Sequence, residues 1–306
     1  MESVSSIREM KARCRAWRRQ GLSVGLVPTM GFLHRGHGSL VERSVRENAR
    51  TAVSIFVNPT QFGPGEDLEA YPRDPARDSA YLKSLGANLL FMPEPSEMYP
   101  PGFAAVAEVP ALSGGLCGAS RPGHFRGVCT VVLKLLHISS PDRAYFGMKD
   151  AQQFFVLRRM ARDFDMDASL VPCETVREED GLAMSSRNSY LTPEERAAAP
   201  LLRTALLAAE DYLKGGGRDA VKACAIVRET LAPEPRFALD YAEAVSTAEL
   251  QPVGAVEAEI LLAAAARLGK ARLIDNVVFD PAGTSKKARG QDRSQDRGQD
   301  RGQRRC

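Results

Sequence analysis

The sequence predicts an α/β protein with a doubly wound parallel sheet, followed by a smaller C-terminal α+β domain. Between about residues 23 and 176, apolar runs rich in Val, Leu and Phe alternate with helical patterns. This alternation is typical of parallel strands that are buried on both faces. After about residue 185 the pattern changes to helical stretches followed by three strand-like ones. A length of 306 residues is enough for about two domains.

The first half of the predicted sheet comes from repeated strand and helix patterns. Residues 1–20 form an amphipathic pattern without an apolar core segment, so they predict a short helix and not a secretory signal. Pro59 and Gly86 are residue types that commonly mark the end of a strand and of a helix, respectively. We therefore expect strands at 23–29, 51–59 and 87–93, and helices at 39–49 and 74–87.

The second half of the sheet and the smaller domain follow the same reasoning. An apolar stretch is long enough for a helix and stops before Pro141. Thr192 followed by Pro193 is a typical helix start with proline at the first helical position. We expect helices at 124–140, 152–164, from 193 and at about 221–231, and strands at 143–148, 169–176, 237–250, 256–269 and 271–279. The domains are then 1–183 and 184–283.

The last 23 residues, 284–306, differ from the rest in composition and charge. They repeat a QDR unit and hold no apolar residue except Ala288 and Cys306, which predicts a disordered low-complexity tail. Eight of the 41 Lys and Arg residues and three of the 38 Asp and Glu residues lie there. The remaining chain is slightly acidic, which argues against nucleic-acid binding, although a binding role for the tail stays open.

Targeting signals and cysteine spacing indicate where the protein resides and which partners it has. No apolar run approaches the ~20 residues of a membrane span. The six cysteines have neither metal-binding nor CxxC spacing, so we expect reduced and mostly buried thiols. We therefore expect a cytoplasmic protein with no membrane and no nucleic-acid partner.

Two of the four histidines, His34 and His37, lie where the first strand turns into a helix. Ligands of open α/β sheets bind at the carboxyl ends of strands, and a helix N-terminus attracts phosphate. In a helical first turn both rings face the same side, and Gly36 lets a ligand approach the backbone. The motif therefore predicts a site where neutral imidazoles donate N–H bonds to growing phosphate charge. Surface histidines or a zinc pair are alternatives, but no third ligand lies nearby.

Other polar blocks follow predicted strands or precede helices. Asn58 and Gln61 follow the second strand, and their uncharged amides both donate and accept. Lys149 is a mobile point charge for phosphate, and Arg121 offers a fork for a carboxylate or phosphate. The segment 185–187 combines two hydroxyls and a guanidinium, which suits a polyphosphate. Local sequence alone leaves solvated turns, ion pairs and helix caps as alternatives.

Six blocks together resemble one family. They are PTMGFLHRGH (28–37), VNPTQFG (57–63), DLEAYPR (67–73), RPGHFRGV (121–128), FGMKD (146–150) and MSSRN (184–188). In this order they are similar to the pantothenate synthetases, also called pantoate–β-alanine ligases, a branch of the HxGH nucleotidyltransferases. The similarity spans residues 24–190, and the following small domain also fits. It implies a Rossmann-like HxGH nucleotidyltransferase fold. Because enclosing an activated intermediate would limit its hydrolysis, we expect the second domain to act as a lid.

The resemblance also implies an activity. It is the ATP-dependent condensation of (R)-pantoate with β-alanine to pantothenate, AMP and pyrophosphate, through a pantoyl-adenylate intermediate, in coenzyme A biosynthesis. Mg²⁺ would accompany ATP, and the enzyme would be a homodimer. Two alternatives stay open: a nucleotidylyltransferase that acts on a phosphomonoester, and a nucleotide-binding regulator that has lost catalysis.

The site residues that the resemblance implies fall into four groups. The catalytic group is His34, His37, Lys149 and Arg187. The ATP-binding group is Met30, Gly31, Phe32, Leu33, His34, Arg35, Gly36, His37, Gly147, Met148, Lys149, Asp150, Val176, Met184, Ser185, Ser186 and Arg187. The substrate-binding group is Asn58, Gln61, Arg121 and Gln153, and the metal candidate is Asp78. Arg35 and Arg77 depart from the family pattern, which often has acidic residues there.

Overall fold

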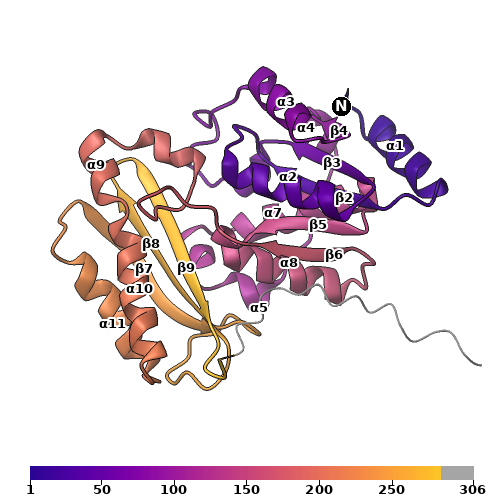
Figure 1. Ribbon diagram of the computed structural model, residues 1–306. Coiled ribbons are helices and arrows are strands. Elements are labelled where there is room, and N and C mark those ends of the chain that lie inside the picture. The colour runs from indigo at the N-terminus through magenta and orange to yellow at the C-terminus, as the bar shows by residue number, and fades with distance from the viewer. Residues whose placement is uncertain (284–306) are drawn as a thin grey trace, which may run out of the picture.

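The structure, a computed structural model, describes residues 1–283, so the predicted tail 284–306 lies outside the described residues (Figure 1). It contains a six-stranded parallel sheet with the order β1-β4-β3-β2-β5-β6 and a three-stranded antiparallel sheet with the order β7-β8-β9. This confirms the predicted fold class. The strands are β1 (Glu2–Val4), β2 (Val24–Thr29), β3 (Arg50–Ile55), β4 (Leu89–Phe91), β5 (Arg143–Gly147), β6 (Ser169–Cys173), β7 (Phe237–Ser246), β8 (Ile260–Leu268) and β9 (Ala271–Phe279).

Helices cover both faces of the parallel sheet. One face shares a core with α1 (Ile7–Arg19), α7 (His124–Ser139) and α8 (Ala151–Asp163). The other face packs against α2 (Arg35–Glu47) and α3 (Pro75–Ser84). Successive strand residues point to opposite faces, so Leu26 and Val27 of β2 lie in different cores, and both are fully buried. This explains why β2 reads as a continuous apolar run.

The strand order places a crevice at one edge of the parallel sheet. From β2 the chain proceeds through β3 and β4 to one side, and then returns to β5 and β6 on the other. The connections after β2 and β5 therefore leave in opposite directions. In open α/β sheets ligands bind at such a switch point, outside the carboxyl ends of the strands. Thr29 ends β2 here and Gly147 ends β5.

The C-terminal sheet lies between its own helices and the parallel sheet (Figure 1). The helices α10 (Leu201–Lys214) and α11 (Ala220–Leu231) pack on one face and form a separate core. On the other face, Leu261 and Ala263 join the core of the first unit. The boundary at 183/184 stays a prediction.

Several boundaries differ from those expected, for local physical reasons. A short edge strand, β1, precedes α1 in the segment expected to be helix throughout. The helix expected at 39–49 begins at Arg35, because His34 caps it. Pro200 separates α9 (Pro193–Ala198) from α10. The short helices α4 (Pro95–Met98), α5 (Pro110–Ser113) and α6 (Cys117–Ser120), and the 3₁₀ turns η1 (Pro59–Gln61), η2 (Met148–Asp150) and η3 (Ser186–Tyr190), were not expected.

The expectations about membrane-spanning segments and about the cysteines can be compared with the structure of residues 1–283. Within that range, no helix combines the length and apolarity needed to cross a membrane. Cys14, Cys117, Cys129, Cys173 and Cys224 are buried free thiols, as expected. Cys306 lies outside the described residues.

Candidate active site

Two adjoining cavities open at the switch point of the parallel sheet. One, of about 230 Å³, lies at the carboxyl ends of β2 and β5. The other, of about 560 Å³, lies between α6, the start of α7 and the C-terminal sheet. Their shared wall consists of Arg121, His124, Lys149, Asp150, Gln153, Ser185 and Arg187. A ligand could therefore extend from the sheet edge toward the second domain.

The two histidines cap the helix that they introduce. His34 is the N-cap residue of α2, and its Nδ1 accepts the Gly36 N–H at 3.1 Å. The Nδ1 of His37 accepts the His34 N–H at 3.3 Å. A neutral imidazole that accepts at Nδ1 carries its proton at Nε2. Capping therefore sets the tautomer of both rings and leaves each Nε2–H as a donor.

Gly36 lets the two rings lie close together. Their centroids are 4.1 Å apart, and both rings line the smaller cavity. A Cβ atom at position 36 would lie 2.8 Å from Cε1 and 2.9 Å from Nδ1 of His34. Such contacts would force the ring to move, so the glycine is needed for packing. The close packing of the His34 ring on residue 36 explains why a glycine lies between the two histidines.

Burial keeps both rings neutral. It lowers the pKa of His34 to about 4, with the Lys149 and Arg77 charges acting in the same direction. Burial also lowers the pKa of His37 to about 3, helped by His34 and Lys149. At neutral pH the rings therefore act as N–H donors. Proton transfer from an imidazolium is disfavoured by these pKa values.

Two arginines of the site are held by carboxylates from one loop. Arg187 forms a fork with Asp67, with N···O distances of 3.0 and 2.9 Å. Arg121 forms a similar fork with Glu66, at 2.8 and 2.6 Å. Burial raises the pKa of Asp67, but the hydrogen bonds and charge of Arg187 outweigh it, so the pKa lies below its usual value. An anionic ligand at these guanidiniums would compete with the loop carboxylates.

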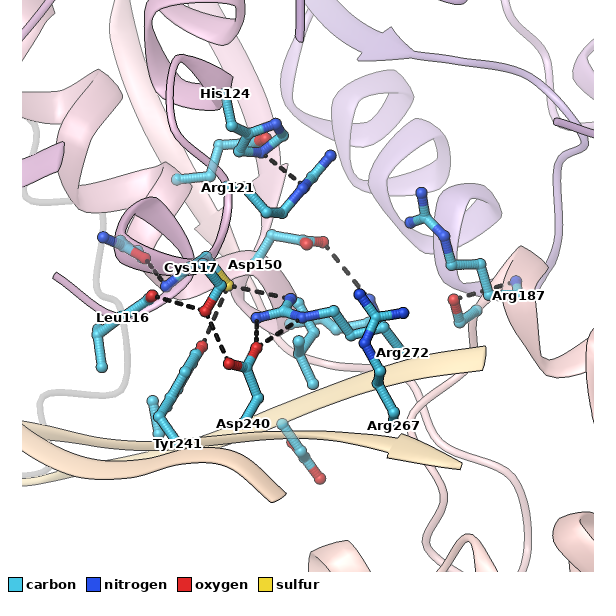
Figure 2. Close-up of a pocket in the computed structure, with 18 of the residues that line it drawn as sticks. Leu116, Cys117, Arg121, His124, Asp150, Arg187, Asp240, Tyr241, Arg267 and Arg272 are labelled. Atoms are coloured by element: carbon cyan, nitrogen blue, oxygen red, sulfur yellow. Dashed lines mark hydrogen bonds and ion pairs between the residues drawn. The ribbon is translucent and has the colours of Figure 1, made fainter. Parts of the chain in front are cut away.

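Figure 2 shows how the larger cavity joins the two domains. Arg121 and His124 enter from the first domain, whereas Asp240, Tyr241 and Arg272 come from the C-terminal sheet. Arg272 donates to Asp240 at 2.9 and 2.6 Å, and Asp240 also accepts from Ser120 of α6 at 2.8 Å. These bonds connect the C-terminal sheet to the wall of the cavity.

The two amides that follow β3 have different surroundings. Asn58 is 1% exposed, and its Nδ2 donates to Gln61 Oε1 at 3.0 Å and to the Gly127 carbonyl at 3.1 Å. Its Oδ1 accepts from Tyr99 at 2.7 Å. With these groups engaged, Asn58 orients Gln61 and is a weaker candidate for ligand contact. Gln61 and Gln153 both line the smaller cavity.

Asp78 stabilises the loop that leads into the histidine motif. Its two carboxylate oxygens accept the N–H groups of Phe32 and Leu33 at 2.7 and 2.8 Å. The neighbouring Arg77 donates to the Leu33 carbonyl at 3.1 Å, and its guanidinium lies 5.2 Å from the Phe32 ring centre. Phe32 has a positive φ of 49°, a conformation that needs such support. This arrangement favours a structural role for Asp78 over the metal role expected from the sequence.

Most residues expected in the site do line the smaller cavity. They are Met30, His34, Gly36, His37, Asn58, Gln61, Arg121, Gly147, Lys149, Asp150, Gln153, Val176, Met184, Ser185, Ser186 and Arg187. Six expected residues line neither cavity: Gly31, Phe32, Leu33, Arg35, Met148 and Asp78. Arg35 is exposed. Gly31, Phe32 and Leu33 belong to the loop before α2, Asp78 supports that loop, and Met148 belongs to the turn before α8.

Sequence reasoning assigned no role to Glu66, Asp67 and Tyr71. Asp67 and Tyr71 stand in the DLEAYPR block, so a signal was present without an assigned chemistry. The Tyr71 hydroxyl lies 3.4 Å from Ser186 Oγ. Glu66 and the residues of the C-terminal sheet carried no signal, because their partners are distant in sequence.

Known proteins share both this sequence and this fold. A family model described as pantoate-beta-alanine ligase matches residues 2–278. Pantothenate synthetase of Ruminiclostridium cellulolyticum is 51% identical over 281 residues, which is 92% of this chain and 100% of that protein. That of Thermotoga neapolitana is 52% identical over 279 residues, which is 91% of this chain and 100% of that protein.

Two solved structures extend the likeness to three dimensions. The pantothenate synthetase of Thermus thermophilus has a TM-score of 0.86 and 49% identity, covering 90% of this chain and 99% of its own. The pantoate-beta-alanine ligase of Francisella tularensis, complexed with beta-gamma ATP and β-alanine, has a TM-score of 0.74 and 33% identity, covering 92% and 99%. The match extends over nearly the whole of each chain, so this chain belongs to the pantoate–β-alanine ligase family.

Proposed function

We propose that the chain condenses pantoate with β-alanine at the expense of ATP, through a pantoyl-adenylate intermediate. The observation that carries the proposal is the His34–His37 pair, whose rings line the same cavity as Lys149 and Arg187 and accept backbone N–H groups at Nδ1. Neutral donors and fixed cations stabilise charge that develops on phosphate oxygens. The beta-gamma ATP and β-alanine bound to the Francisella tularensis relative support the same kinds of ligand here.

The cavity walls suggest where each ligand binds. ATP would lie along the N-terminus of α2, with its phosphates near Lys149, Ser185, Ser186 and Arg187 and its base near the Val176 backbone. Pantoate would contact Gln61 and Gln153, which line the smaller cavity. Arg121 would meet an anionic substrate after leaving Glu66.

Two displacements then form the amide. The pantoate carboxylate attacks the α-phosphorus of ATP, and pyrophosphate leaves. The β-alanine amine next attacks the acyl carbon of the adenylate, AMP leaves with the electrons of the C–O bond, and the proton lost by the amine passes to water. AMP is a far better leaving group than oxide, and no nucleophile of the protein is needed. The protein contributes alignment and charge stabilisation.

The described residues do not build a dedicated metal cage. No group of three or more His, Cys, Asp or Glu side chains among residues 1–283 could hold a metal ion. The Asp78 oxygens are engaged by backbone N–H groups. We propose that Mg²⁺ enters with ATP, held by phosphates and water, and we assign it no protein ligand.

The proposal has three further parts, of which the homodimer comes from the resemblance. The C-terminal domain, 184–283, acts as a lid that limits hydrolysis of the adenylate. The enzyme is a cytoplasmic homodimer that serves coenzyme A synthesis. Light scattering during gel filtration tests the dimer: the mass of one 33.3 kDa chain would refute it.

Isotope exchange tests the adenylate mechanism. Labelled pyrophosphate should enter ATP when pantoate is present and β-alanine is absent, because the first displacement is reversible. Folded protein that binds ATP but shows no pantoate-dependent exchange would refute the proposal. A stable dinucleotide formed from a phosphomonoester would instead favour a nucleotidylyltransferase.

A further inference from the structure

Asn276, in the second domain, holds the turn that carries Lys149. Its Nδ2 lies 2.9 Å from the Met148 carbonyl oxygen and 3.0 Å from the Lys149 carbonyl oxygen. Both partners are acceptors, so the amide nitrogen must face them. A residue of β9 therefore donates two hydrogen bonds to a turn that lies more than 120 residues earlier in the chain.

The turn around Lys149 has little support of its own. η2 is a single 3₁₀ turn of three residues, and its N-cap Gly147 provides no side-chain cap. α8 follows directly, and its N-cap Asp150 makes no side-chain capping bond either. Short 3₁₀ turns have poor hydrogen-bond geometry, and uncapped helix starts fray. The two bonds from Asn276 are thus a main restraint on the backbone at position 149.

The neighbouring residue connects the same strand to the other phosphate-facing segment. Asp275 is 4% exposed and forms a fork with Arg177, with N···O distances of 2.7 and 2.9 Å. Arg177 belongs to a hairpin in which the Met184 N–H donates to the Val176 carbonyl oxygen at 3.0 Å. Ser185 to Arg187 follow this hairpin directly. β9 therefore holds the segments of Lys149 and Arg187 from one point.

We propose that Asn276 is a positioning residue that sets the place of the Lys149 ammonium relative to the phosphates. The inference rests on the proposed function, in which Lys149 stabilises charge that develops on the phosphate oxygens. On this account the C-terminal domain fixes the geometry of the phosphate site in addition to covering it. Asn276 lines the larger cavity but acts through the backbone of residues 148 and 149.

The isosteric variant Asn276→Asp removes these two bonds. It replaces the donor by a carboxylate oxygen that faces two carbonyls, so the turn loses its bonds and gains repulsion. The pantoate-dependent exchange rate at saturating ATP should fall about tenfold or more, because small misplacements of a catalytic charge are costly. The KM for ATP should change by less than about threefold, since Lys149 acts mainly on charge formed in the transition state.

The matched control is Glu249→Gln, which is also isosteric and weakens a contact between the domains by removing its charge. Glu249 pairs with Arg159 of α8 at 2.7 Å, on the exposed surface and away from both cavities. Its exchange rate should stay within about twofold of the wild type. An equal loss of rate in both variants would overturn the proposal, because any weakening of the domain contact would then suffice.

A double-mutant cycle with Lys149→Met separates positioning from general stability. If Asn276 acts through Lys149, Asn276→Asp should lower the residual exchange by less than about twofold once the lysine charge is absent. The same fold-loss in both backgrounds, or no loss in either, would overturn the inference.

A readout independent of catalysis completes the test. Amide hydrogen–deuterium exchange over residues 148–154 should be faster in Asn276→Asp than in the wild type and in Glu249→Gln. Unchanged protection of this segment would overturn the positioning role. If the wild type lacks pantoate-dependent exchange, the proposed function fails, whereas the amide protection still decides whether Asn276 holds the turn.

Discussion

At the scale of residues, one pair of side chains performs two tasks. The Nδ1 atoms of His34 and His37 accept backbone N–H groups at the start of α2. Serine or asparagine could cap the helix as well, but neither would present a second N–H on the far side of a ring. This double use explains why imidazole occupies both positions. The Nδ1 atom makes the structural contribution, and the Nε2–H group makes the catalytic one.

Replacement of His37 by asparagine tests this separation. The asparagine oxygen can accept the His34 N–H in place of Nδ1, but no donor replaces Nε2–H. We expect pantoate-dependent pyrophosphate exchange to fall roughly 10²–10³-fold, the usual cost of losing one transition-state donor. ATP binding, measured by calorimetry, should persist. The control His137→Asn changes an exposed histidine of α7, and its exchange rate should not change.

At the scale of elements, the apolar runs predicted the central strands closely. The run 23–29 became β2 at Val24–Thr29, because a strand buried on both faces needs apolar residues throughout. The start of α2 was placed too late, because histidine is not among the usual capping residues. β1 has three residues and lies at the sheet edge, where neither length nor alternation gives a signal.

A glycine substitution probes the start of α2. In Gly36→Ala the new methyl group would meet the His34 ring at 2.8 Å, so the ring must rotate out of its capping position. We expect the exchange rate to fall about tenfold or more. Gly114→Ala serves as the control, since no atom lies within 4 Å of its added Cβ and its φ is −85°. Equal rates in the two variants would contradict the packing role of Gly36.

Asp78 links α3 to the loop before α2, and its role can be distinguished from metal binding. Asp78→Asn replaces one acceptor by a donor that faces a backbone N–H. We expect the free energy of unfolding in urea to fall by about 1–3 kcal/mol, the cost of leaving a buried donor unpaired. The Mg²⁺ concentration that gives half-maximal exchange should not change. A large increase in that concentration would restore the metal role for Asp78.

At the scale of the whole molecule, the contacts between distant segments could not be predicted. The histidine motif and the MSSRN block carry local signals, and both line one cavity. The pairing of Glu66 with Arg121 and the bonds from Asn276 to the Lys149 turn join residues that are far apart in the chain. A local pattern holds no information about such partners, because the folded topology alone brings them together.

Three partly buried histidines should make the stability of the whole protein depend on pH. Burial lowers the pKa of His34 and His124 to about 4, and that of His37 to about 3. In the unfolded chain these groups bind protons near pH 6.5, so between that pH and about 4 the unfolded state holds more protons. Stability is therefore fully present above about pH 6.5 and falls as the pH decreases.

Urea unfolding at several pH values measures this effect. Each histidine should contribute a slope of up to about 1.4 kcal/mol per pH unit below pH 6.5. In His124→Gln the slope should become smaller, because one of the three groups no longer titrates. A free energy of unfolding that is constant from pH 7 to pH 5 would contradict the burial of these rings.

The capping of α2 by imidazoles has a consequence for when the enzyme becomes competent. The position of the hydrogen atom on each ring is decided when the first turn of that helix closes. Ordinary changes in cellular acidity do not alter it, and no step of turnover has to restore it. The site therefore has its two N–H donors in place as soon as the protein has folded.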